Sequence, residues 1–447
     1  MIKDLTQGSI TKNLLKISLP VMGASLFQMA YQITDMFWLG KLSSDAVAAV
    51  GTAGFYINLS YALATLAFIG VGIKVSQAVG AKKYNQAIEY VSASIILIAI
   101  LSIVISLITV IFRNQLIDFF NINSLYIRNG AISYLAIVIS FSIFKNLNLT
   151  FNRIFIGYGS GRVPLIIGSF SVLLNIILDP IFIFTLDMGI VGAAYATIIS
   201  QVISSITYGF VLIKYSKINK FQGIKLCINK ISIIIKLSYP VTIQRVIFTV
   251  ISIFIGKIIS EWGTDAIAIQ KIGIQLESLS WITAGGMQAA ITSFIGQNYG
   301  AKKLDRLRKG YFSATIIMFG VGAFVTLLFT VFPTQIFSLF VNEPEVISGG
   351  ANYLKILAIS QIFMCIDIMT MGAFNGIGRT GVPPIISVTF TGARIPLSIL
   401  LSSVLSFGVS GIWFSITLTT ILKSTILVIL FLYFLKRVEM ELKPIKA

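Results

Sequence analysis

The sequence predicts an all-α integral membrane protein with twelve transmembrane helices in two six-helix bundles. Of its 447 residues 56% are hydrophobic and 11% are charged, whereas a soluble globular chain carries about 25% charged residues. Apolar stretches of about 20 residues, the length that crosses roughly 30 Å of hydrocarbon, recur along the chain. The second half of the chain also repeats the first. These three observations predict the fold class.

Twelve apolar stretches are long enough to cross a bilayer. The first one lacks the small-residue cleavage site of a signal peptide, so we expect it to be retained as the first span. The expected spans lie near residues 15–39, 46–72, 87–112, 129–151, 163–186, 189–213, 231–258, 266–294, 310–333, 348–371, 383–405 and 410–435.

The charge pattern sets the orientation of these spans. The net charge is +18, and its Lys and Arg residues form short clusters in alternate connections, such as Lys82 with Lys83 and Lys302 with Lys303. Such clusters mark cytoplasmic loops that face anionic lipid, and they do not indicate nucleic acid. We therefore expect a multi-pass membrane protein with both termini in the cytoplasm.

The internal repeat follows a shift of 220 residues, which becomes 219 after one deletion. It superposes Pro20 on Pro240, Gly157 on Gly376 and Gly192 on Gly411, among others. Six spans per half is an even number, so the halves share one orientation and are related by an axis along the membrane normal. The predicted domains are an N-terminal bundle at 1–213, a cytoplasmic linker at 214–230 and a C-terminal bundle at 231–447.

Residues that both halves keep are interpreted as scaffold. Asp45 and Asp265 each follow a hydroxyl residue at the start of a span and are expected to cap a helix. The chain has two cysteines and no histidine, which argues against a disulfide framework, histidine-ligated metal and histidine-based catalysis. A membrane-embedded acyltransferase or protease is disfavoured for the same reason, so no enzyme activity and no cofactor are expected.

The stretch 169–197 holds the main candidate site. Asn175 and Asp179 lie one helical turn apart and so share a face, and Pro180 frees a backbone carbonyl one turn back. A carboxylate costs about 2.5–3.5 kcal/mol at the bilayer centre, which favours a functional role. Asp35 and Thr197 reach a comparable depth from two other spans at 1.5 Å per residue.

These four residues are not kept by the second half. Asp35, Asn175, Asp179 and Thr197 correspond to Ile255, Arg394, Ser398 and Ile416. Two carboxylates close together in low dielectric repel each other when both are ionised, so the site is expected to hold a proton or Na⁺, and hard oxygen ligands suit either ion. Direct ion binding and control of a bend near Pro20 both stay open.

Candidate substrate-cavity residues come from the first span and from the second half. Gln28 and Gln32 lie on one face with Asp35, where they either line a cavity or bond between helices. Met29 and Met36 belong to a seven-residue repeat that suits varied apolar ligands, or lipid and core contacts. Glu277, Asp367 and Arg394 either line a cavity or form internal salt bridges, with Lys271 and Arg245 as further partners.

In combination these residues resemble the multidrug and toxic compound extrusion (MATE) transporters, in particular their prokaryotic DinF-like branch. The resemblance covers essentially the whole chain. It rests on LP at 19–20, TDMFWLG at 34–40, VGAKK at 79–83, GYGSGRVP at 157–164, NIILDPIFIF at 175–184, GIVGAAYATIIS at 189–200, GQNYGAKK at 296–303 and FNGIGRTGVP at 374–383.

The resemblance implies a V-shaped pair of bundles that exports cationic or amphipathic small molecules in exchange for H⁺ or Na⁺. It also implies a cation site at Asp35, Asn175, Asp179 and Thr197, with the Ala193 carbonyl nearby. We expect a monomeric antiporter that works by alternating access in the lipid bilayer. The alternative is a lipid-linked oligosaccharide or lipid flippase of the same superfamily, for which Arg245 and Arg394 would bind pyrophosphate.

Overall fold

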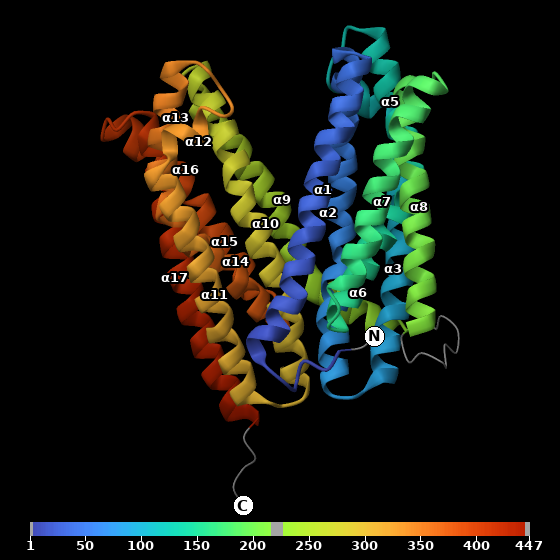
Figure 1. The fold of residues 1–447 in the computed structure, drawn as a ribbon, viewed down its shortest axis with the longest axis vertical. Helices are drawn as coiled ribbons and strands as arrows, with labels where there is room; N and C mark the ends of the chain where they lie inside the picture. Colours follow the sequence, from blue (N-terminus) through green and yellow to red (C-terminus); the bar gives the residue numbers. More distant parts are fainter. Residues whose placement is uncertain (1–2, 216–226, 443–447) are drawn as a thin grey trace, which may run out of the picture. The chain divides into compact units, whose positions relative to one another are not determined.

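The computed structural model describes residues 3–215 and 227–442, which are built from helices and contain no β-strand (Figure 1). Within them nine helices are long and apolar enough to cross a membrane, and two bent helix pairs raise the number to eleven. The twelfth expected span lies in α10 (Thr264–Gly300), which has 37 residues but carries Lys271 and Glu277. The predicted class, an all-α multi-pass membrane protein, is confirmed.

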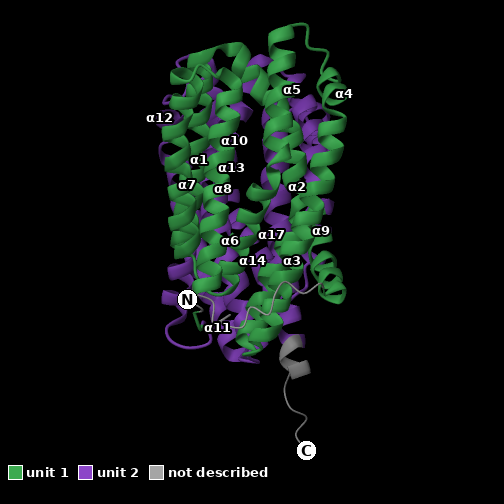
Figure 2. Cartoon of the chain, turned by 90° about the vertical axis from the view of Figure 1, so that its right-hand side faces the viewer, with its two compact units in different colours: residues 1–4, 19–242 green, residues 5–18, 243–447 purple. Residues whose placement is uncertain are grey.

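The chain folds into two compact units, coloured separately in Figure 2. Unit 1 comprises residues 1–4 and 19–242, and unit 2 comprises residues 5–18 and 243–447. The division falls inside the first helix of each repeat, whereas the predicted domains followed the sequence repeat. Most of the predicted linker lies outside the described residues.

Each unit holds the helices of one repeat. Helix α1 (Ile10–Leu42) begins in unit 2 and continues in unit 1, and α9 (Ile228–Ser260) begins in unit 1 and continues in unit 2. Unit 1 also holds α2 (Ser44–Gly80), α3 (Tyr84–Ile111), α4 (Arg113–Asp118), α5 (Leu125–Ser140), α6 (Ser142–Gly157), α7 (Arg162–Pro180), the π-helix η1 (Ile181–Thr185) and α8 (Gly189–Tyr215). Unit 2 also holds α10, α11 (Leu304–Val331), α12 (Pro333–Phe337), α13 (Pro344–Ala358), α14 (Ser360–Gly376), α15 (Val382–Gly392), α16 (Arg394–Ile399), the π-helix η2 (Leu400–Val404) and α17 (Val409–Leu442).

One span in each unit is sharply bent. The bend is 49° between α5 and α6 and 53° between α13 and α14. A hydroxyl group bonds to a backbone carbonyl at each bend: Ser106 donates to Ile139 at 2.5 Å, and Thr326 donates to Ala358 at 2.6 Å. Ser106 and Thr326 correspond under the shift of 220. A side chain that satisfies a carbonyl in this way stabilises a bend without proline.

Close approach of backbones explains the repeated glycines Gly192 and Gly411. A Cβ atom on Gly192 would lie 2.5 Å from the Phe182 carbonyl oxygen in η1, and one on Gly411 would lie 2.6 Å from Leu401 in η2. Both π-helices therefore pack directly on the backbone of the following span. In unit 1 this contact fixes α8 against the segment that follows Pro180.

Gly192→Ala is expected to destabilise the protein by about 1–3 kcal/mol, the usual cost of overpacking, because the Phe182 backbone must move to admit the new methyl group. The measurement is an unfolding titration of the purified protein in mixed micelles. Gly209→Ala is the matched control in the same helix, where nothing lies within 4 Å of the added Cβ; it should be neutral or slightly stabilising. Equal stability of the two variants would contradict the close packing of α8 on η1.

The start of α9 packs on α2 inside unit 1. A Cβ on Gly70 would lie 2.5 Å from the Ile234 carbonyl oxygen, so glycine is needed there. The Gly70 N–H donates to the Ser238 hydroxyl at 2.9 Å, and the hydroxyls of Thr65 and Thr242 lie 2.5 Å apart. These bonds satisfy polar groups at a close helix crossing.

In unit 2, side chains hold the backbone of the segment before α1. Gln297 accepts from the Leu5 N–H at 2.9 Å, Lys303 donates to the Thr6 carbonyl at 2.9 Å, and Arg306 donates to the Gln7 carbonyl at 2.7 Å. Leu5 itself is fully buried. Lys303, which the sequence suggested as a membrane anchor, thus also holds the N-terminal segment.

Two local expectations need correction. Ser43, not Asp45, caps α2, because its hydroxyl accepts from the Ala46 N–H at 3.0 Å; Asp45 lies in the first turn, where a negative charge suits the helix dipole. Gly263 precedes α10 without a side-chain cap, and Asp265 again lies in the first turn.

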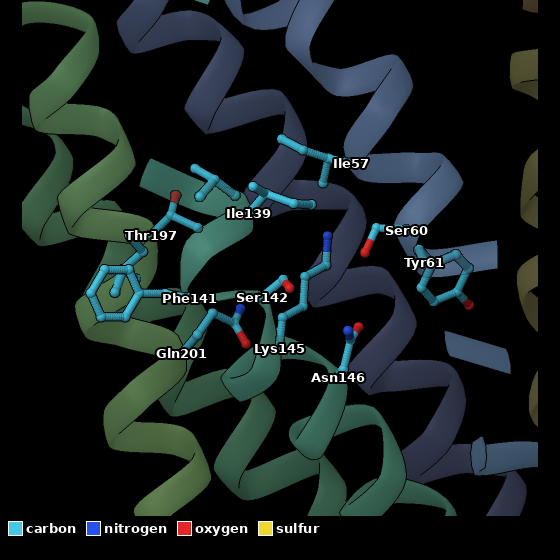
Figure 3. A pocket seen from close by; sticks show the side chains of 12 residues that line it. Ile57, Ser60, Tyr61, Ile139, Phe141, Ser142, Lys145, Asn146, Thr197 and Gln201 are labelled. Carbon is cyan, nitrogen blue, oxygen red and sulfur yellow. The ribbon is translucent and has the colours of Figure 1, made fainter. Parts of the chain in front are cut away.

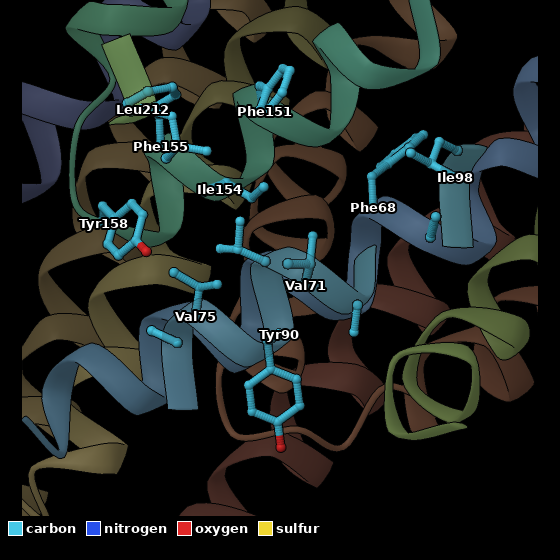
Figure 4. Close-up of a cluster of buried hydrophobic side chains, with 14 of the residues drawn as sticks. Phe68, Val71, Val75, Tyr90, Ile98, Phe151, Ile154, Phe155, Tyr158 and Leu212 are labelled. Atoms are coloured by element: carbon cyan, nitrogen blue, oxygen red, sulfur yellow. The ribbon is translucent and has the colours of Figure 1, made fainter. Parts of the chain in front are cut away.

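The apolar core of unit 1 has two parts. One is shown in Figure 4 and packs α2, α3, α6 and α8 around Phe68, Val71, Ile98 and Phe155. The other includes Ala193 and joins the end of α1 to α2, α5, η1 and α8. The second part thus packs two of the helices that carry candidate-site residues, α1 and α8, into unit 1.

Candidate functional site

The four residues predicted for the cation site come from three helices of unit 1. Asp35 is on α1, Asn175 and Asp179 are on α7, and Thr197 is on α8. The Asn175 side-chain amide donates to Asp179 Oδ1 at 3.2 Å; their spacing of one turn predicted a shared face, and the hydrogen bond was not predicted. The hydroxyls of Tyr31 and Thr197 lie 3.3 Å apart and connect α1 to α8.

Three buried oxygen atoms in this group have no hydrogen-bond partner: Asp35 Oδ1, Asn175 Oδ1 and Asp179 Oδ2. Asn175 is 2% exposed and Asp179 is fully buried. Buried acceptors without partners cost free energy. A proton on a carboxylate would supply a donor, and a cation would supply a direct ligand bond, so the arrangement suits either. Cation binding itself stays a prediction.

Two tyrosines that the sequence did not single out lie near both carboxylates. Tyr31 and Tyr134 interact electrostatically with Asp35 and Asp179. Tyr31 precedes Asp35 by one turn on the polar face of the first span, which was a usable signal. The sequence around Tyr134 held no such signal, because only the tertiary packing of α5 brings this side chain near the carboxylates.

Ala193 is fully buried in α8, one turn before Thr197. It follows Gly192, whose backbone meets η1, so the packing that places α8 also places Ala193. The role of the Ala193 carbonyl as an ion ligand stays a prediction.

The predicted cavity residues of the first span have exposed or partly exposed side chains. Gln28, Gln32 and Met36 are exposed, and Met29 is partly buried. Their exposure suits contact with a ligand or with lipid, so their role in a substrate cavity stays a prediction.

The acids of unit 2 are engaged inside the protein. Asp367 forms a salt bridge of 2.7 Å with Lys423 on α17, a partner that was not predicted for it. Glu277 accepts from the Tyr353 hydroxyl at 2.5 Å. Arg394 donates to Thr419 and Thr420, at 2.9 Å each, and attracts the Glu277 carboxylate over a longer distance. This geometry favours internal pairing over cavity lining.

No group of three or more Asp, Glu, Cys or His side chains that could hold a metal ion occurs among the described residues. The site at Asp35 and Asp179 is a different kind of arrangement, because amide and hydroxyl oxygens accompany its two carboxylates. These oxygen ligands suit H⁺ or Na⁺ as the transported ion.

A protein-family model decides the affiliation of the chain. The model MatE matches residues 20–181 and again residues 240–400. The matches begin at positions related by the shift of 220 and end at positions related by 219, which supports the internal repeat. The chain belongs to the MatE family. Two family units in one chain account for the paired architecture.

Relatives and solved structures agree with membership of the MatE family. The chain is 28% identical over 435 residues to "Probable multidrug resistance protein NorM" of Thermotoga maritima, with 95% of this chain and 92% of that protein covered. It is 26% identical over 419 residues to "Multidrug export protein MepA" of Staphylococcus haemolyticus, with 92% and 90% covered. Its fold is similar to "Crystal structure of MATE in the bent conformation", with a TM-score of 0.91, 22% identity and 98% of both chains covered.

Proposed function

We propose that this MatE-family protein is a cation-coupled antiporter that exports cationic or amphipathic small molecules by alternating access. The carrying observation is the group at Asp35 and Asp179, where three buried acceptor oxygens have no partner. The names of the two relatives, a multidrug resistance protein and a multidrug export protein, support the substrate class.

The geometry suggests how an ion acts at this site. With both carboxylates ionised, α1 and α7 repel each other through Asp35 and Asp179. A proton turns one acceptor into a donor, and Na⁺ binds oxygens from both helices; either joins α1 to α7. Binding and release of the ion therefore change the contact between α1 and α7. This contact has two states, and both the ion and the substrate would shift the balance between them.

The energy for such a cycle depends on the charge of the substrate. When a substrate without net charge leaves for one entering ion, that ion's charge moves through 100 mV and releases about 2.3 kcal/mol, which corresponds to about a fifty-fold substrate gradient. When a monovalent cation leaves for one entering ion, no net charge crosses the membrane, and the proton or sodium concentration gradient drives export. The flippase alternative receives no specific support, because Arg394 is engaged with Thr419 and Thr420.

The proposal is tested in liposomes that contain the purified protein and a fluorescent cationic dye. A proton gradient and a sodium gradient are imposed separately, with protein-free liposomes as the control. Dye movement driven by one gradient and absent without protein is the expected result, and it also identifies the ion. Dye movement that ignores both gradients, or no movement, would contradict the antiporter, and a fluorescent-lipid scrambling assay would then test the flippase.

A further inference from the structure

A pocket inside unit 1 lies between α2, α5, α6 and α8 (Figure 3). Its cavity volume is about 20 Å³, which gives room for a small polar group of a ligand and not for a whole ligand. Polar residues from three helices line it: Ser60 and Tyr61 on α2, Lys145 on α6, and Thr197 and Gln201 on α8. Of these residues only Thr197 belongs to the predicted cation site.

Lys145 is the charged residue of the pocket wall. It lies in the first turns of α6, just after the bend at Phe141, and its ammonium group points toward Ile57 and Ser60 in Figure 3. The ion pairs among the described residues join Arg128 to Asp118, Lys230 to Glu89 and Lys423 to Asp367. None of them involves Lys145, so its charge lacks a carboxylate partner in the part of the chain that the structure describes.

Ser60 provides a second and independent observation. Its side chain is 3% exposed, it lines the same pocket, and its hydroxyl oxygen has no hydrogen-bond partner. The neighbouring polar groups are already engaged: Asn146 donates to Ser102 at 2.9 Å, and Asn148 donates to Gln201 at 2.7 Å. An ammonium group and a hydroxyl therefore face one small space without a partner for either.

Comparison of the two repeats shows that this charge is not scaffold. The shift of 219 places Lys145 on Met364, and the shift of 220 places Ile57 on Glu277. At these two paired positions unit 1 has an isoleucine and a lysine, and unit 2 has a glutamate and a methionine. In unit 2 the methionine sulfur accepts from Trp281 Nε1 at 2.6 Å, so the position has a purely structural contact there.

We propose that Lys145 and Ser60 form a subsite for the carboxylate group of an amphipathic substrate. This proposal rests on the proposed export function, and it adds zwitterions to the expected substrates. The ammonium and the hydroxyl both donate to carboxylate oxygens, and charge-assisted bonds of this kind are strong in low dielectric. One ammonium with one hydroxyl suits a monoanion better than a phosphate dianion, which needs more donors.

Thr197 connects this subsite to the predicted cation site at Asp35 and Asp179. It lines the pocket and also contacts Tyr31 at 3.3 Å, which in turn lies near Asp35 and Asp179. A zwitterionic substrate placed here has its carboxylate at Lys145 and its cationic part on the side of Asp35. Protonation or Na⁺ binding at Asp35 and Asp179 then weakens the hold on the cationic part, as antiport requires.

The test uses two rhodamine dyes that differ in one group, a free carboxylate in one and its ethyl ester in the other. Binding of each dye to the purified protein is measured by fluorescence anisotropy for wild type, Lys145→Met, Lys145→Arg and Ser60→Ala. Lys271→Met is the matched control, an exposed lysine in a span of unit 2. Thermal unfolding of every variant verifies folding.

Lys145→Met is expected to weaken binding of the carboxylate dye about tenfold and to leave the ester dye within twofold. Lys145→Arg should retain most of the affinity, and Ser60→Ala should cause a smaller loss that is also confined to the carboxylate dye. An equal loss for both dyes, or no loss for either, would overturn the subsite. Because binding is measured without a gradient, failure of gradient-driven transport would refute the antiporter separately.

Discussion

Replacing Asp179 with asparagine is expected to stop gradient-driven efflux and to leave the protein folded. The amide cannot release or accept the transported proton, and it removes the negative charge that would bind Na⁺. It still reaches Asn175, whose bond of 3.2 Å to Asp179 needs only an oxygen acceptor. Efflux from dye-loaded liposomes should fall to the level of protein-free liposomes.

The control for this change is Asp187→Asn. Asp187 lies in the exposed turn after η1 with φ of 52°, a conformation that asparagine tolerates well. It makes the same chemical change outside the site, so transport should be unchanged. Asp35→Asn should behave as Asp179→Asn does. Wild-type efflux by both site variants would exclude this group as the coupling site and direct attention to Glu277.

The second large effect is expected on stability, at the salt bridge between Asp367 and Lys423. Lys423→Met leaves the carboxylate of Asp367, a residue that is 1% exposed, without its cation. Breaking a buried pair by removing one partner costs about 3–5 kcal/mol. The free energy of unfolding should fall by that amount in mixed-micelle titrations.

The double variant Asp367→Asn with Lys423→Met serves as the internal control. The shift of 219 places Asp367 on Asn148, so the first change copies the residue that unit 1 has at this position. With both charges removed, no buried ion is left unpaired, and most of the lost stability should return. If the double variant were as unstable as Lys423→Met, packing of the lysine stem, and not the charge pair, would explain the loss.

The parts of the fold that sequence predicted are those set by local pattern. Apolar length predicted the spans, and the shift of 220 predicted the repeated architecture. The bends between α5 and α6 and between α13 and α14 were missed, because their cause, the hydroxyls of Ser106 and Thr326, lies on another helix. The span at 266–294 was predicted as well, although α10 carries Lys271 and Glu277; the Glu277 carboxylate accepts from the Tyr353 hydroxyl inside unit 2.

In the candidate site, too, local spacing was predictable and contacts between helices were not. The spacing of Asn175 and Asp179 placed them on one face, and their absence from the second half marked them as specialised. The pairing of Asp367 with Lys423 depends on how α14 and α17 are rotated against each other, which no local pattern records. Tyr134 was missed because only the tertiary packing of α5 brings it near the two carboxylates.

The sharing of α1 and α9 between the units has an evolutionary consequence. Residues 5–18 belong to unit 2 and residues up to 242 of α9 belong to unit 1, so each repeat donates its first segment to the other unit. A half-length ancestor with this topology would have left the contacts of Gln297, Lys303 and Arg306 unmade within a single chain. Such a chain could make these contacts only with a second copy of itself, as in a domain-swapped homodimer.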